Sequence, residues 1–174
     1  MVDKLDKLLK DFISTMGKVN RTLDNLADLG QEKKQFIILG QVKELDKLIQ
    51  REGIIVSNLE KLEGARFKYQ QDLASKWELT AEELSASIIL QKVKVNYPDY
   101  YEELDQEIRR LEYNVIRLKA LNTGNNELIN QSLDYIDVMQ SILLGDAAGT
   151  YSDQGQQANE TPSRVKINLV DKKA

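Results

Sequence analysis

The sequence predicts an all-α fold: an elongated antiparallel hairpin or bundle of three long helices plus one short helix, followed by a flexible C-terminal tail. Apolar residues recur at alternating steps of four and three over most of the chain, which places them on one face of each helix. Only two prolines occur among 174 residues, and Leu, Lys, Glu, Asp and Gln are abundant, as is typical of long helices. We expect a helical domain over residues 1–145 and the tail over residues 146–174.

A first long helix is expected over about residues 2–39. Gly17 and Gly30 weaken it by about 1 kcal/mol each relative to alanine where they are exposed. Gly30 lies on the apolar stripe, where Lys33 follows it, so this glycine is a candidate for a kink. Gly40 should end the helix. The stripe consists of Leu5, Leu9, Phe12, Met16, Val19, Leu23, Leu26 and Ile37.

A second long helix is expected over about residues 42–77. Its connection at Gly40 is so short that the two helices should be antiparallel neighbours. Glu52 and Arg66 lie in its apolar row, so we expect each to pair with a residue of another helix. Gly53 and Gly64 either admit a close neighbour or simply weaken the helix. The apolar row consists of Leu45, Leu48, Ile55, Leu59, Leu62, Tyr69 and Leu73.

A capping box formed by Thr80 and Glu83 predicts a short third helix over about residues 80–92. The sequence Asn-Tyr-Pro at positions 96–98 then interrupts the chain. Asp99 restarts it, with acidic residues in the first turn that suit the helix dipole. The fourth helix is expected to reach Leu144, with Gly145 ending it.

The fourth helix changes character along its length. Residues 100–119 carry nine charged side chains, whereas residues 120–145 carry three. Its four-three seam is apolar at nine of twelve positions, and the exceptions are Asn122, Asn125 and Ser132. These side chains need hydrogen-bond partners if buried, either in the protein's own bundle or on another protein. The seam consists of positions 104, 108, 111, 115, 118, 122, 125, 129, 132, 136, 139 and 143.

A second apolar row widens this face in the weakly charged half of the helix. It consists of Leu121, Leu128, Tyr135 and Ile142, spaced by seven residues. A helix face of this width is either deeply buried in its own fold or available to a partner. A foreign amphipathic helix is the kind of partner that such a stripe accommodates.

Composition argues against several classes of function. The chain has no cysteine and no histidine, so it lacks disulfides, thiolate metal sites and the usual general base. We therefore expect no enzyme, and predict no catalytic, cofactor-binding or metal-binding residue. A net charge of -4 argues against a nucleic-acid surface. No run approaches the length of a membrane span and the N-terminus lacks a signal peptide, so we expect no stable membrane insertion and a cytoplasmic location.

The expected tail is poor in large apolar residues. Its last segment, residues 164–170, alternates polar and apolar side chains. This segment fits either a short strand added to a partner or a frayed end.

With these elements in order, the chain resembles the FlgN family of flagellar export chaperones. The segment LNxxNxxL is present as Leu121, Asn122, Asn125 and Leu128, and the pattern Tyr-x-x-x-Gly as Tyr151 and Gly155. The second helix contributes Glu52, Leu59, Leu62 and Arg66, and residues 165–169 give a basic and apolar terminus. The tail is longer and richer in glutamine than the family pattern, and the third helix falls in a variable part of the family.

The resemblance implies a cytoplasmic chaperone for the hook-filament junction proteins FlgK and FlgL. Such a chaperone binds its cargo through the last helix, prevents premature association and delivers the cargo to the type III export gate. Tyr151 falls on the tyrosine that contacts the gate protein FlhA. The cargo-binding segment and its row correspond to Leu121, Asn122, Asn125, Leu128, Ile129, Ser132, Tyr135, Ile136 and Met139.

The main alternative is a structural coiled-coil protein without a role in export. In that case the wide apolar stripe would be covered by a second copy of the chain in a homodimer. The mass in solution, and the response to added FlgK or FlgL, distinguish the two readings.

Overall fold

The computed structural model describes residues 3–143, which form four α-helices and one 3-10 turn and contain no strand. The elements are α1 (Lys4–Ile38), α2 (Val42–Lys76), α3 (Ala86–Asn96), η1 (Pro98–Tyr100) and α4 (Tyr101–Leu143). The predicted all-α fold, with three long helices and a short one, is confirmed. The chain divides into two compact units, residues 1–133 and residues 134–174. Within the second unit the description covers the last turns of α4, up to Leu143.

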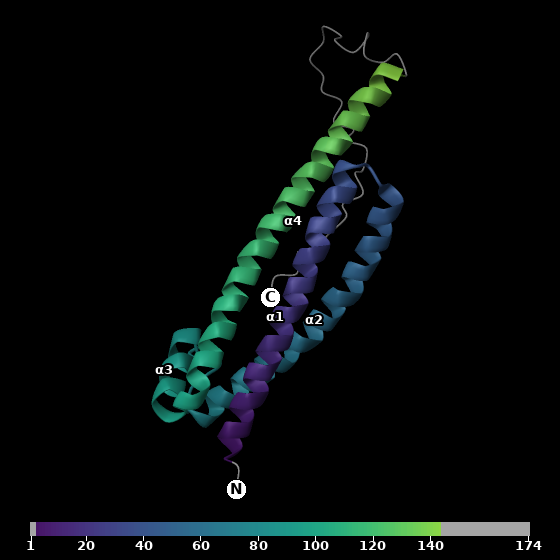
Figure 1. Ribbon diagram of the computed structural model, residues 1–174. Coiled ribbons are helices and arrows are strands. Elements are labelled where there is room, and N and C mark those ends of the chain that lie inside the picture. The colour runs from purple at the N-terminus through teal and green to yellow at the C-terminus, as the bar shows by residue number, and fades with distance from the viewer. Residues whose placement is uncertain (1–2, 144–174) are drawn as a thin grey trace. The chain divides into compact units, whose positions relative to one another are not determined.

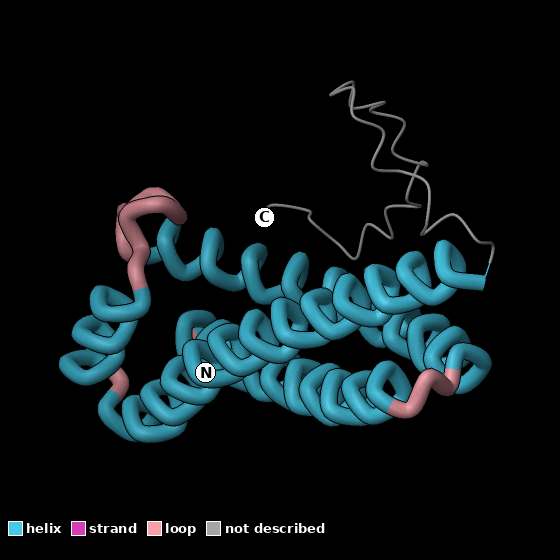
Figure 2. The backbone as a smooth tube through the Cα atoms, turned by 90° about the horizontal axis from the view of Figure 1, so that it is seen from above, coloured by secondary structure: helices cyan, strands magenta, loops and turns pink. Residues whose placement is uncertain are grey.

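In the first unit, α1 and α2 form an antiparallel hairpin, and α4 runs in the same direction as α1 (Figure 1). The hairpin helices approach closely along their length, as predicted from the short connection. Gly40 forms that connection with a φ of 65°, a left-handed conformation that glycine adopts without steric cost. The corner made by α3 and η1 connects α2 to α4 (Figure 2).

The main core lies where α1 begins and α4 starts. Side chains from all four helices meet there, and Leu9, Leu73, Val93 and Leu104 are fully buried. Leu84, in the loop before α3, is buried in the same cluster. Burial of a leucine or valine side chain contributes roughly 1.5–3 kcal/mol, so this cluster fixes the corner onto the hairpin.

A second, smaller core continues along α1. Val19, Leu23 and Leu26 are buried there, and the side chains packed on them from α2 and α4 are half-buried: Ile55, Val56, Leu59, Leu62, Leu111 and Leu118. The apolar stripe predicted for α1 is therefore confirmed as the face around which both other long helices pack. Leu5, at the start of the stripe, is half-buried.

The short helix begins later than predicted. The Thr80 and Glu83 capping box does form, with Thr80 N donating to Glu83 Oε2 at 2.8 Å and Glu83 N donating to Thr80 Oγ1 at 3.2 Å. It closes a turn instead of starting a helix, because burial of Leu84 directs the chain into the core first. The helix starts at Ala86 with Ser85 as its N-cap, and ends at Asn96, four residues beyond the expected end.

The expectation of interhelical ion pairs is right for one residue and wrong for the other. Glu52 of α2 pairs with Lys33 of α1 at 2.5 Å, and the Lys33 side chain is 4% exposed. Arg66 instead binds Glu63 and Gln70 of its own helix, because both lie within one turn of it.

Of the two alternatives for Gly53 and Gly64 of α2, the structure excludes the close approach of a neighbour. A Cβ added at Gly53 or Gly64 would meet no atom within 4 Å. The close approach lies on α1, where a Cβ at Gly30 would meet Leu121 Cδ1 at 3.3 Å. Helix α1 continues through Gly30 to Ile38.

Candidate partner-binding site

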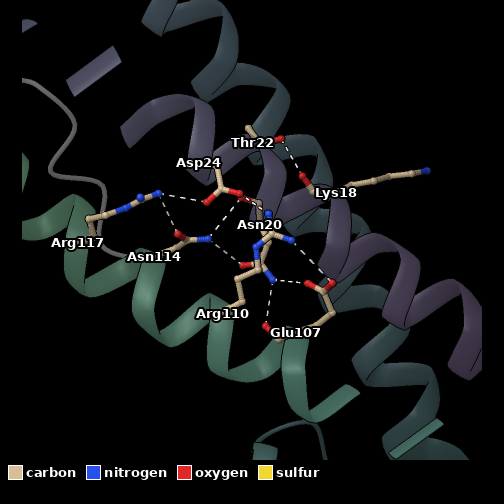
Figure 3. Close-up of polar contacts among 8 residues, drawn as sticks. All are labelled: Lys18, Asn20, Thr22, Asp24, Glu107, Arg110, Asn114 and Arg117. Carbon is tan, nitrogen blue, oxygen red and sulfur yellow. Dashed lines mark hydrogen bonds and ion pairs between the residues drawn. The ribbon is translucent and has the colours of Figure 1, made fainter. Parts of the chain in front are cut away.

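The interface between α1 and α4 contains a layer of polar side chains (Figure 3). Asn20 of α1 is fully buried, and its Nδ2 donates to Glu107 O at 3.0 Å and to Glu107 Oε2 at 2.6 Å. Asn114 Nδ2 in turn donates to Asn20 Oδ1 at 3.3 Å. Buried amides require partners of this kind, so the two asparagines fix one position of α4 along α1.

Ion pairs flank the two asparagines. Asp24 accepts hydrogen bonds from Arg110 and Arg117, the latter at 3.1 Å between Arg117 Nη2 and Asp24 Oδ1. The same Nη2 donates to Asn114 Oδ1 at 3.2 Å. The Arg117 guanidinium also lies 5.3 Å from the ring centre of Tyr113, within the range of a cation–π contact.

A second polar contact lies further along the same interface. Asn125 is buried, and its Nδ2 donates to Gly30 O at 2.9 Å. The hydrogen-bonded pairs of residues 20 and 114, and of residues 30 and 125, are offset by 94 and 95 positions, so α4 keeps a constant parallel register on α1. With an offset of 95 positions, Leu133 lies level with Ile38, the last residue of α1. Helix α1 therefore has no residue that could pair with α4 beyond Leu133.

The face of α4 that packs on α1 differs from the predicted seam after Leu111. Asn114 is buried and Val115 is 39% exposed, because Asn20 provides a partner for the amide. Leu121, Asn125 and Leu128 then lie on the packed side. Asn122 and Ser132 are exposed, and Ser132 Oγ donates to Leu128 O at 2.9 Å.

An open groove of about 500 Å³ lies along this side of α4. Gln31 and Lys34 of α1 form one wall, and the lining residues from α4 are Arg117, Ala120, Leu121, Gly124, Asn125 and Leu128. The groove thus coincides with the first half of the segment that the sequence predicts as partner-binding. Its apolar lining and two cationic side chains suit an amphipathic peptide.

The predicted cargo-binding residues fall into three groups in the structure. Leu121, Leu128 and Ile129 are half-buried; Asn122 and Ser132 are exposed; Asn125 is buried and bonded to α1. Of the alternatives open for the asparagines, Asn125 follows the internal one. The side chains of Tyr135, Ile136, Ile142 and Met139 lie outside the described part of the structure, as do Gly145, Tyr151 and the segment 164–170.

Asn20 and Asn114 are the polar residues that the sequence interpretation missed. A signal for them exists: Glu107, Arg110, Asn114 and Arg117 form a polar row at steps of three and four beside the apolar seam. Such a row usually marks a solvated face. Here it marks the contact with Asn20 and Asp24 of α1.

The described helices include none that is long and apolar enough to cross a membrane. Residues 3–143 likewise contain no group of three or more potential metal ligands. The fold defines a class of all-helical protein in which an open groove lies between two long helices.

Comparison with known protein families identifies the particular family. The sequence model of the family described as FlgN protein matches residues 1–159, which is most of the chain. The chain belongs to the FlgN family, a family of flagellar export chaperones that bind flagellar proteins. Comparisons with curated proteins and with solved structures gave no significant match.

Proposed function

We propose that this protein is a cytoplasmic export chaperone that binds the hook-filament junction proteins FlgK and FlgL through α4. In this role it prevents their premature association and delivers them to the type III export gate. Membership of the FlgN family supports the general role. The choice of cargo, the segment that binds it and the docking to FlhA are the parts that we propose.

The difference between the two parts of α4 is the observation that carries this proposal. Leu104 and Ile108 are buried in the main core. Further along, Leu121, Leu128 and Ile129 are half-buried. Leu121 and Leu128 line an open groove, and Ile129 follows Leu128 in the sequence. Covering this apolar surface with a cargo helix would stabilise the complex by about 25 cal/mol per Å² of area removed from water, less the cost of ordering.

The proposed roles of individual residues follow from their positions. Leu128 and Ile129 supply apolar contact, while Asn122 and Ser132, being exposed, are placed to bond cargo. We propose that Tyr135, Ile136 and Met139, the remaining residues of the predicted cargo-binding segment, also contact cargo. Leu121 and Asn125 also hold α4 on α1, so we propose that they shape the surface as well as contact cargo.

Co-purification with FlgK and FlgL tests this assignment. Leu128→Asp places a charge beside the groove, and we expect it to abolish co-purification while the helical circular dichroism is retained. Ile116→Asp is the matched control, because Ile116 lies on the same helix and is 69% exposed. If both variants bind cargo as the wild type does, the binding surface lies elsewhere. If Leu128→Asp unfolds the protein, that side chain belongs to the core.

The docking of loaded chaperone to the gate needs a separate experiment. We propose that Tyr151 contacts FlhA, so Tyr151→Ala should leave binding of FlgK unchanged and weaken capture of the loaded complex by FlhA. Tyr151→Phe keeps the ring and serves as the control. Equal capture of wild type and Tyr151→Ala would refute this role.

Self-association is a second candidate function, favoured by apolar side chains on the outer face of α4. Tyr113 and Ile116 are 62% and 69% exposed, and a second copy could cover both. Sedimentation of the purified protein with and without FlgK decides between the two functions. A dimer that persists when FlgK is added, and that binds none of it, would favour self-association.

A further inference from the structure

The chemistry of the groove between α1 and α4 indicates what kind of cargo segment it receives. The charged side chains that line it, Lys34 and Arg117, are both basic. Arg117 is partly neutralised by Asp24 at 3.1 Å. Lys34 is exposed and takes part in no ion pair within the described part of the chain, so one wall of the groove presents an uncompensated positive charge.

The floor of the groove has a gap at Gly124. A Cβ added there would meet no atom within 4 Å, so the notch lacks any side chain of the protein itself. Leu121 and Leu128 border the notch one turn away on either side. The notch therefore leaves room for a side chain of a partner between these two leucines.

The length of the groove fits a short helical segment. Arg117 and Leu128 are eleven positions apart on α4, which corresponds to about 16 Å along the helix axis. About three turns of a partner helix would span this distance with one apolar face toward Gly124. Its flanking side chains would then lie beside Lys34 and Arg117.

We propose that the groove binds an acidic amphipathic helix of the cargo, with an apolar side chain over Gly124 and carboxylates facing Lys34 and Arg117. This inference rests on the proposed chaperone function and specifies the chemistry of the segment recognised. An acidic cargo helix gains ion pairs at the rim, whereas a basic one meets like charge. Such complementarity determines which helix is accepted more than how tightly it binds.

Two synthetic amphipathic peptides of about 20 residues test the chemistry without assuming the identity of the cargo. They share one leucine face and differ only in carrying Glu or Lys beside it. We expect the full-length protein to bind the acidic peptide about tenfold more tightly than the basic one at low salt. Equal affinities, a preference for the basic peptide, or no binding of either would overturn the proposal.

Two pairs of variants locate that preference. Lys34→Glu should remove most of the preference for the acidic peptide over the basic one. Lys68→Glu, at an exposed lysine of α2, should leave this preference unchanged. Gly124→Trp fills the notch and should weaken the binding of the acidic peptide about tenfold or more. Gly64→Trp is the matched control, because a side chain there also meets nothing within 4 Å. Circular dichroism of each variant verifies the fold, and unaltered peptide binding by Lys34→Glu and Gly124→Trp would place the site elsewhere.

The same variants titrated with full-length FlgK separate this inference from the proposed function. If FlgK binds wild type, Lys34→Glu and Gly124→Trp equally, the groove proposal is wrong while the chaperone function stands. If the acidic peptide binds as expected but neither FlgK nor FlgL binds, the groove chemistry stands and the proposed cargo is wrong. If Gly124→Trp converts a dimer into a monomer, the groove is an interface between copies of this chain and the proposal fails.

Discussion

The side chain of Asn125 donates a 2.9 Å hydrogen bond to the main-chain oxygen of Gly30, which lies inside α1. The absence of a side chain at Gly30 lets Leu121 of α4 come close to the α1 backbone. Together the two contacts hold α4 beside α1 in the segment predicted to bind cargo. The surface offered to a partner thus depends on a polar contact within the protein.

Asn125→Ala should destabilise the protein by about 1–2 kcal/mol, since it removes a buried hydrogen bond and leaves a small void. Asn122→Ala is the matched control, because Asn122 is exposed on the same helix, and it should change stability by less than about 0.5 kcal/mol. Urea denaturation of both variants measures the difference. Equal effects would mean that Asn125 does not anchor α4.

The asparagine pair of the polar layer should be energetically coupled. Asn20→Ala removes the side-chain hydrogen bonds that Asn20 makes with Asn114 and Glu107, so we expect the free energy of unfolding to fall by about 1–3 kcal/mol. The double variant Asn20→Ala/Asn114→Ala should lose less than the sum of the single variants, with a coupling of about 0.5 kcal/mol or more. A double-mutant cycle by urea denaturation measures this coupling, and simple additivity would contradict it.

The ion pair of Lys33 and Glu52 should matter more than pairs on the surface. Glu52→Gln leaves the Lys33 side chain, which is 4% exposed, without its counter-charge. We expect the free energy of unfolding to fall by about 3 kcal/mol or more. Glu32→Gln removes a pair with Arg51 whose side chains are 43% and 56% exposed. This control should cost less than about 1 kcal/mol. Similar losses in thermal or urea unfolding would show that the α1–α2 pair is not effectively buried.

The start of α1 is attached to η1 by a contact that responds to pH. Tyr100 Oη donates to Asp6 Oδ1, which lowers the pKa of Asp6 below its usual 3.8, and Lys10 at 3.1 Å acts in the same direction. The same hydrogen bond, followed by desolvation, raises the pKa of Tyr100 above its usual 10.0. The contribution of Asp6 to the stability of the fold is therefore present above the pKa that Asp6 has in the unfolded protein, and it is lost as the pH falls through its pKa in the folded protein. That of Tyr100 is present below its unfolded pKa and lost as pH rises through its folded value.

Tyr100→Phe should remove the pH dependence due to Tyr100 and reduce that due to Asp6, on which Lys10 still acts. We expect the stability difference between wild type and variant to be largest near neutral pH and to shrink toward strong acid and strong alkali. Urea denaturation at several pH values measures it, and NMR titration of Asp6 should show its pKa returning toward the usual value. A difference that does not change with pH would contradict the contact.

The long helices follow from the sequence because their burial repeats along a single stripe. From Leu9 to Ile37, the residues of that stripe are buried in the structure, and Gly40 has the left-handed conformation that a helix end favours. The start of α3 differs from the expected one because a capping box satisfies local hydrogen bonds in a turn as well as in a helix. Only the tertiary burial of Leu84 distinguishes the two.

The register of α4 could not be predicted from hydrophobicity. Val115 is the more apolar choice for the seam, yet Asn114 is buried because Asn20 lies opposite it on another helix. The result is an extra step of three in the seam, a shift known from coiled coils. The groove depends on this register and on two residues of α1, Gln31 and Lys34, which no pattern within α4 reveals.

Hydrogen exchange of the full-length protein, with and without full-length FlgK, tests the central claim most directly. The account predicts that FlgK slows exchange of the α4 amides in residues 121–139, while those near Leu104, in the main core, stay unchanged. Unchanged exchange over residues 121–139 in a complex shown to form, or slowing confined to α2 and α3, would contradict it.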